Sequence, residues 1–129
     1  MAKSFYIATR KDREAEANEI AKALGAAGWK RTLIWSSREE DVAEDYATLA
    51  QQELNAIRDA DALIVMLPGG FGTHVEIGAA LALRKPIILH SPDEKTLNSP
   101  YPCPFHYHPG VKLLISKIVD VNEIVSNLS

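Results

Sequence analysis

The sequence has 129 residues, 47% of them hydrophobic and 24% charged, with a net charge of −3, which fits one domain spanning 1–129. Its Lys and Arg residues are scattered, so we expect no nucleic-acid partner, and no apolar run is long enough for a signal peptide core or a membrane span. The single cysteine, Cys103, excludes an internal disulfide and is typical of a cytoplasmic protein.

Apolar, β-branched segments alternate with amphipathic segments along the chain. The apolar segments predict strands at 4–9, 31–35, 61–67, 85–90 and 114–119. The segments between them have helical periodicity and predict helices at 17–27, 39–58, 74–83 and 121–128. The stretch 98–110 holds four prolines and is predicted to be irregular, either as a lid over a pocket or as an arm onto a partner subunit.

This order of elements is typical of a parallel sheet that is covered by helices on both faces. The predicted fold class is therefore α/β, as a single doubly wound (flavodoxin/Rossmann-like) domain with a five-stranded, mostly parallel sheet. Ligands of such sheets bind at the carboxyl ends of the strands. In this sequence those ends carry the segments 9–10, 36–38, 68–73 and 90–92.

The densest glycine cluster follows the third predicted strand, in the stretch "LPGGFGTHVEIG" at 67–78. Gly69, Gly70 and Gly72 permit positive φ angles and close approach of the backbone to a ligand. Free amides at the start of the following helix favour an anion or a sugar hydroxyl. The spacing matches neither the dinucleotide-binding GxGxxG motif nor the P-loop.

Thr73 and Glu76 have the T-x-x-E spacing of a capping box, in which Thr73 caps the helix and Glu76 reaches back to its amide. The alternative is a functional carboxylate. In the first helical turn Glu76 is expected to be ionised by the helix dipole. An ionised carboxylate in a glycine-lined pocket is suited to attack the anomeric carbon of a sugar.

A second carboxylate, Glu53, lies in the middle of an apolar stripe on the helix predicted at 39–58. The stripe consists of Val42, Tyr46, Leu49, Ala50, Ala56 and Ile57. A carboxylate in such a stripe must be paired, hydrogen-bonded, solvated by rotation of the helix, or facing a pocket. Candidate structural partners are Arg10 and Arg38, and the functional alternative is a ligand site.

The segments "FYIATR" and "AQQELNAIRDADALIVMLPGGFGTHVEIGAALALRKPIIL" resemble the nucleoside 2-deoxyribosyltransferase family. The resemblance implies a small doubly wound fold and cleavage of the N-glycosidic bond of nucleosides or nucleotides. It implies that Glu76 is the nucleophile, that Glu53 contacts the ligand and that Tyr6 positions the nucleophile. It also implies a homodimer or larger homo-oligomer, and no cofactor is expected.

Two departures from the family pattern bear on the reaction. Transferases carry an aspartate six residues before the nucleophile, where this sequence has Gly70, and the family's acidic residue at the position of Glu53 is an aspartate. Relatives that hydrolyse nucleotides hold the 5′-phosphate with this loop. Here Gly69, Gly70, Gly72 and Thr73 would do so, helped by Arg10 or Ser37, and Thr9 is a further candidate for substrate binding.

The stretch "PGGFGTHVE" also fits the P-G-G-x-G-T-x-x-E motif of the LONELY GUY phosphoribohydrolases, in which the glycines hold phosphate and the glutamate is catalytic. Both resemblances place Glu76 at the anomeric carbon. The expected function is hydrolysis, or transfer to a second base, at the N-glycosidic bond of a nucleoside or nucleoside 5′-monophosphate. The alternative is a non-catalytic nucleotide-binding or sensor domain of the same fold.

Histidines and the cysteine near the carboxyl end of the chain are candidate metal ligands. His106 and His108 would share a face if their segment were extended, and Cys103 is near them. Because a metal site needs three or four ligands in fixed geometry and the prolines supply none, no metal is expected. His74 is expected to be a surface residue of its helix.

Overall fold

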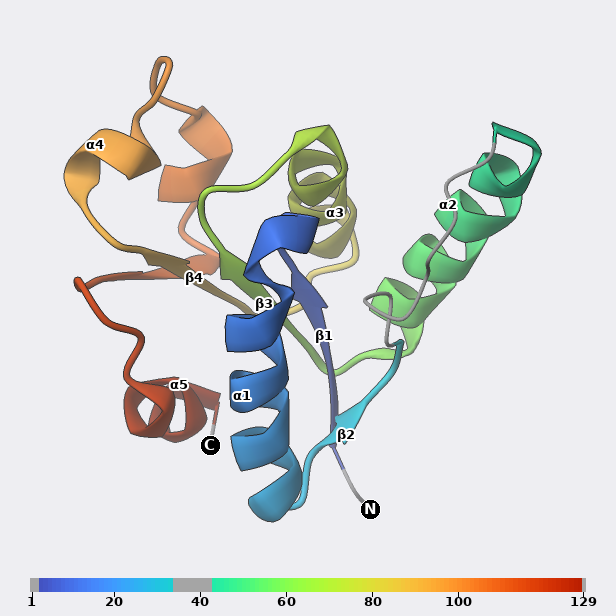
Figure 1. The fold of residues 1–129 in the computed structure, drawn as a ribbon, viewed down its shortest axis with the longest axis horizontal. Coiled ribbons are helices and arrows are strands. Elements are labelled where there is room, and N and C mark those ends of the chain that lie inside the picture. The colour runs from blue at the N-terminus through green and yellow to red at the C-terminus, as the bar shows by residue number, and fades with distance from the viewer. Residues whose placement is uncertain (1–2, 34–42, 129) are drawn as a thin grey trace.

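The computed structural model describes residues 3–33 and 43–128, which contain a five-stranded sheet in the order β2-β1-β3-β4-β5 (Figure 1). Every pair of neighbouring strands is parallel. The strands are β1 (Ser4–Ala8), β2 (Lys30–Arg31), β3 (Ala62–Met66), β4 (Ile87–Ser91) and β5 (Val111–Ile115). The predicted α/β class is confirmed, and the described sheet is wholly parallel.

Helices cover both faces of the sheet (Figure 1). On one face α1 (Glu14–Ala26) and α5 (Val121–Leu128) pack together, and on the other α2 (Ala43–Asp59) lies beside α3 (Phe71–Ala82). Because each central strand contacts helices above and below, β1, β3 and β4 are buried almost throughout. Three short helical turns complete the described chain: η1 (Lys11–Arg13), α4 (Glu94–Leu97) and η2 (Pro104–Tyr107).

Several boundaries differ from the prediction. Helix α3 begins three residues earlier than expected, within the glycine loop, and β5 begins three residues and ends four residues before the predicted strand at 114–119. The proline-rich stretch contains the 3₁₀ turn η2, because Pro104 stands at its first position, where the missing amide costs no hydrogen bond. The turn α4 has no counterpart in the prediction.

The predicted apolar stripe of α2 is only partly buried. Ala56 and Ile57 are buried, whereas Tyr46 and Ala50 are exposed, and Val42 lies outside the described residues. The reason is length: a 17-residue helix is about 25 Å long and a five-residue strand about 17 Å. The amino-terminal half of α2 therefore extends beyond the sheet (Figure 1). Glu53 belongs to the half that packs.

Among the described residues, no helix is both long and apolar enough to cross a membrane.

Candidate active site

A hollow of about 420 Å³ lies at the carboxyl edge of the sheet, beside the ends of β1 and β3. These two strands flank the topological switch point of the 2-1-3-4-5 order, where parallel α/β sheets bind ligands. The residues that line it come from the segment after β1, from α2 and from α3: Thr9, Arg10, Lys11, Asp12, Glu53, Gly70, Gly72, Thr73 and Glu76.

One tyrosine hydroxyl lies between two of the carboxyl groups that line this hollow. The Tyr6 hydroxyl is 2.8 Å from Oε2 of Glu76 and 3.1 Å from Oε1 of Glu53. Tyr6 and Glu76 are buried, and Glu53 is half-buried. The three residues come from β1, α2 and α3. The structure therefore brings together the three residues to which the family resemblance assigns the nucleophile, its positioning and a ligand contact.

Burial determines the protonation of this cluster. Desolvation first, and then the charge of Glu53, raise the pKa of Glu76 to about 9, although the hydrogen bond from Tyr6 acts in the opposite direction. Desolvation and the two carboxylates also raise the pKa of Tyr6. At neutral pH the site thus holds a neutral tyrosine and a protonated Glu76.

The expectation that Glu76 is ionised by the helix dipole is wrong, and so is the predicted capping box. Because α3 starts at Phe71, Glu76 is in its second turn, and burial outweighs the dipole. Gly70 is the N-cap, and its amide donates to Oγ1 of Thr73 at 3.1 Å. Thr73 therefore ties the start of the helix, and the Glu76 carboxyl is left to contact Tyr6.

The glycine loop has a steric reason for only one of its glycines. A Cβ on Gly69 would lie 2.6 Å from the Thr73 Cγ2 atom, so a larger residue at this position would force the Thr73 side chain or the loop to shift. Gly70 and Gly72 would meet nothing closer than 3.9 Å, which leaves open space above the backbone. None of the three has a positive φ, so that part of the prediction is wrong. The open backbone at Gly70 and Gly72 faces the hollow.

The other predicted ligand residues have different positions. The Thr9 hydroxyl donates to the Met66 carbonyl at 2.7 Å, which joins the ends of β1 and β3 at the hollow. Arg10 lines the hollow and forms an ion pair with Asp12 at 2.8 Å rather than with Glu53. Ser37 and Arg38 lie outside the described residues.

Arg13 is not among the predicted site residues, although it contacts the backbone just before the glycine loop. Its guanidinium donates to the Leu67 carbonyl and pairs with Glu16 at 2.6 Å. The sequence does contain an indication of this residue, because the charged segment "RKDR" directly follows β1 and so lies at the edge of the sheet where ligands bind. Arg13 fixes the backbone that leads into the glycine loop.

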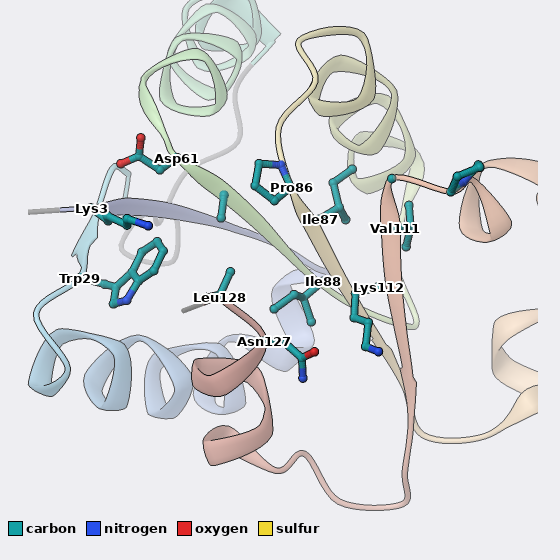
Figure 2. A pocket seen from close by; sticks show the side chains of 13 residues that line it. Lys3, Trp29, Asp61, Pro86, Ile87, Ile88, Val111, Lys112, Asn127 and Leu128 are labelled. Atoms are coloured by element: carbon teal, nitrogen blue, oxygen red, sulfur yellow. The ribbon is translucent and has the colours of Figure 1, made fainter.

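A second hollow, of about 280 Å³, lies at the opposite, amino edge of the sheet (Figure 2). Trp29, Pro86, Ile87 and Val111 form much of its wall, and the ammonium of Lys3 lies 5.7 Å from the centre of the Trp29 ring. No pair of carboxyl groups faces this hollow from the described residues.

One group of described residues has the composition of a metal site, and it lies outside the hollow. His74, Cys103 and His106 each offer a ligand atom, and these atoms lie within 4.8 Å of one another. His106 is buried and contacts His74, and His108 is not part of the group. The aromatic residues of the same stretch, Tyr101, Phe105 and Tyr107, are exposed and do not line the hollow.

The fold and the site define a doubly wound α/β protein with two carboxyl groups and a tyrosine at its switch point. The chain belongs to the nucleoside 2-deoxyribosyltransferase family, whose model matches residues 2–128. This match confirms the first resemblance, whereas the relation to the LONELY GUY motif stays a prediction. No curated protein matches the sequence significantly.

Solved structures of two kinds of enzyme are similar to this chain. The CMP N-glycosidase BcmB of Clostridium botulinum has a TM-score of 0.67 at 23% identity, covering 98% of this chain and 97% of that one. The 2-deoxyribosyltransferase of Bacillus psychrosaccharolyticus has a TM-score of 0.63 at 19% identity, covering 94% and 89%. The 2-deoxyribosyltransferase of Leishmania mexicana has a TM-score of 0.55 at 25% identity, covering 70% and 65%. Family and fold agree on an enzyme of N-glycosidase or deoxyribosyltransferase type.

Proposed function

We propose that this protein cleaves the N-glycosidic bond of a nucleoside or nucleoside 5′-monophosphate, with Glu76 as the nucleophile. The observation that carries the proposal is the Tyr6 hydroxyl between the carboxyl groups of Glu76 and Glu53, at 2.8 and 3.1 Å. Both of these carboxyl groups line the hollow at the switch point. Family membership supports the class of reaction, and the geometry supports these residues.

The proposed reaction has two steps. An oxygen of Glu76 bonds to the anomeric carbon while the bond from that carbon to the base nitrogen breaks, and the electron pair of that bond remains on the base. Water then attacks the glycosyl ester, releases the sugar and restores the Glu76 carboxyl group. If a second base attacks instead, the same intermediate yields transfer. We favour hydrolysis, because Gly70 stands where the transferases carry an aspartate.

The raised pKa keeps Glu76 protonated at rest. Because the nucleophile must lose its proton before it attacks, a neighbouring group must accept that proton. We propose that Glu76 passes its proton to the Tyr6 hydroxyl while Tyr6 passes its own to Glu53, across the contacts of 2.8 and 3.1 Å that Tyr6 makes with these two groups, so that Tyr6 remains neutral throughout. Glu76 becomes ionised, and Glu53 becomes a neutral acid. Glu53 then gives its proton to the departing base, and the proton count is unchanged.

Groups at the mouth of the hollow suit a phosphate. The amides of the first turn of α3 lack partners within the helix, and Gly72 and Thr73 of that turn line the hollow. Arg10 and Lys11, from the segment after β1, add positive charge to the same lining, where Asp12 pairs with Arg10. These groups favour a nucleoside 5′-monophosphate over a nucleoside. An oligomer whose subunits share sites stays a prediction.

The test is release of free base by the purified protein. We would incubate it with ribo- and deoxyribonucleosides and their 5′-monophosphates, each with and without a second base, and separate the products chromatographically. Glu76→Gln keeps the size and neutral charge of the resting side chain but cannot form the ester. We expect its turnover to fall by about 10³-fold or more.

The matched control is Glu19→Gln, which changes an exposed carboxylate on α1 that does not line the hollow. We expect it to keep most of the activity. Ligand binding without base release from any member of the panel, in folded protein, would contradict the proposal and favour the non-catalytic binding domain. If a nucleoside or nucleotide that contains the second base forms, the reaction is transfer rather than hydrolysis.

A further inference from the structure

The outer side of α3 carries a cluster that the proposed reaction does not use. His74 projects from the first turns of α3, and Cys103 and His106 come from the proline-rich stretch that packs against this helix. One nitrogen of each histidine and the cysteine sulfur lie within 4.8 Å of one another. His74 is exposed, Cys103 half-buried and His106 buried.

Backbone geometry orients two of these side chains together. Cys103 is the N-cap of the 3₁₀ turn η2, and His106 is the third residue of that turn. In a 3₁₀ helix residues three apart lie on the same side, one above the other. Pro104 fixes the start of the turn, and the amide of His106 donates to the Cys103 carbonyl at 3.1 Å. The sequence C-x-x-H is therefore a pair of ligands with fixed geometry.

The third side chain is held in the tautomer that binds metals. Nδ1 of His74 is 2.9 Å from the Gly70 carbonyl, which can only accept, so this nitrogen carries the hydrogen. Nε2 of the neutral ring is then bare. A histidine whose second nitrogen donates to a carbonyl is the usual arrangement at metal sites.

The unprotonated Nε2 atom of His74 faces the Nε2 atom of His106. The two Nε2 atoms of His74 and His106 are 3.2 Å apart, and the ring centres are 5.1 Å apart. Two nitrogens bound to one tetrahedral Zn²⁺ at 2.0–2.1 Å are about 3.3 Å apart. This spacing suits a cation that both nitrogens ligate, or a proton shared between them.

We propose that His74, Cys103 and His106 bind one zinc ion per chain. The donor set of two imidazoles and one thiolate is that of a borderline-soft divalent cation with tetrahedral geometry. The exposed side of His74 leaves the fourth position to water. The metal would fasten the proline-rich stretch to α3. Through the bond from His74 to Gly70, it would also stiffen the start of the glycine loop.

The experiment measures metal binding directly and needs no substrate. Reduced, chelator-treated full-length protein is titrated with Zn²⁺ by calorimetry and with Co²⁺ by absorption, because cobalt shows a thiolate charge-transfer band and the visible bands of tetrahedral coordination. We expect a stoichiometry of one. We also expect saturating Zn²⁺ to raise the Tm by about 5–10 °C.

Variants distinguish the site from adventitious binding. Cys103→Ser should abolish the cobalt charge-transfer band, and His74→Gln should weaken zinc binding by about 100-fold or more. His108→Gln is the matched control, since His108 belongs to the same stretch but not to the cluster, and it should bind as wild type. His74 and Cys103 are not buried, so both variants should fold, which circular dichroism checks.

No zinc binding by the folded, reduced wild type would overturn the proposal. Binding that survives in Cys103→Ser and His74→Gln, or that is lost in His108→Gln, would also overturn it. The cluster would then be a hydrogen-bonded pair of histidines that pins the loop. Neither outcome depends on base release, so this test and that of the proposed reaction fail independently.

Discussion

The two edges of the sheet differ in what their hollows contain. The carboxyl edge has a buried tyrosine between two carboxyl groups and an open glycine backbone, while the amino edge has an apolar wall of Trp29, Pro86 and Ile87 (Figure 2). At the carboxyl edge Glu76 has a pKa raised to about 9. At the amino edge Asp61 accepts two hydrogen bonds from Ser4, which give it a structural task.

The comparison shows that the edge of the sheet on which a hollow lies decides which chemical groups line it. Parallel strands direct the amino ends of the following helices, and the loops before them, to the carboxyl edge. Amides and side chains with changed pKa values collect there. The amino edge receives the carboxyl ends of helices and the segments that lead into strands. Substitutions at the two edges should therefore have different effects.

The largest expected difference concerns one carboxylate from each edge. Glu53→Gln removes the proposed acid, so kcat/KM should fall by about 10²–10³-fold. Asp61→Asn keeps an oxygen that accepts from Ser4, so kcat/KM should be unchanged. Steady-state assays of base release measure both. Equal losses of kcat/KM in the two variants would show that Glu53 has no specific role in the reaction.

The second effect is the dependence of stability on pH. Glu76 is protonated in the folded protein up to about pH 9 but ionises near its ordinary pKa of 4.5 when unfolded. Between these values the folded state binds more protons, so stability falls as pH rises, by about 1 kcal/mol per pH unit. Denaturant unfolding of wild type and Glu76→Gln from pH 5 to 9 should show the extra slope in wild type alone.

Parallel slopes in those two proteins would show that Glu76 is ionised in the folded state. The proton transfer through Tyr6 would then have no function. Asp61→Asn again serves as the comparison at the amino edge, and its slope should match that of wild type.

A smaller effect is expected within the glycine loop. Gly69→Ala forces a Cβ against the Thr73 side chain and should destabilise the protein by about 1–3 kcal/mol. Gly72→Ala adds a methyl group to open space inside a helix and should stabilise it by about 0.5–1 kcal/mol. Urea unfolding measures both. A tolerated Gly69→Ala would show that the loop relaxes.

The smallest effect belongs to the amino edge. Lys3→Ala removes the ammonium from the Trp29 ring and should cost about 0.5 kcal/mol of stability with no change in base release. Thermal unfolding and the same assay measure these effects. A clear loss of activity in this variant would make the amino edge part of the functional site.

Much of this architecture follows from local pattern. Apolar strands that alternate with amphipathic helices predict the parallel sheet, and the position of Glu53 in an apolar stripe is visible in the sequence alone. The glycine loop after β3 predicts the site for the same reason, because the carboxyl ends of parallel strands share an edge. Those features depend on periods of two and 3.6 residues, which a single sequence displays.

The rest depends on contacts between distant residues. Tyr6 is 47 positions from Glu53 and 70 from Glu76, so no local pattern reveals the shared hydroxyl. The start of α3 at Phe71 and the pairing of His74 with His106 are likewise outcomes of packing.

By itself, the sequence determined the class of fold and the edge of the sheet to which the glycine loop leads, and it singled out the two carboxylates that line the hollow there. Only the tertiary structure decided that Glu76 is protonated at rest. Charge in a protein is set by burial and by neighbours brought together in folding. The sequence alone indicates the effect of the helix dipole on Glu76, but burial has the larger effect on the pKa of this residue.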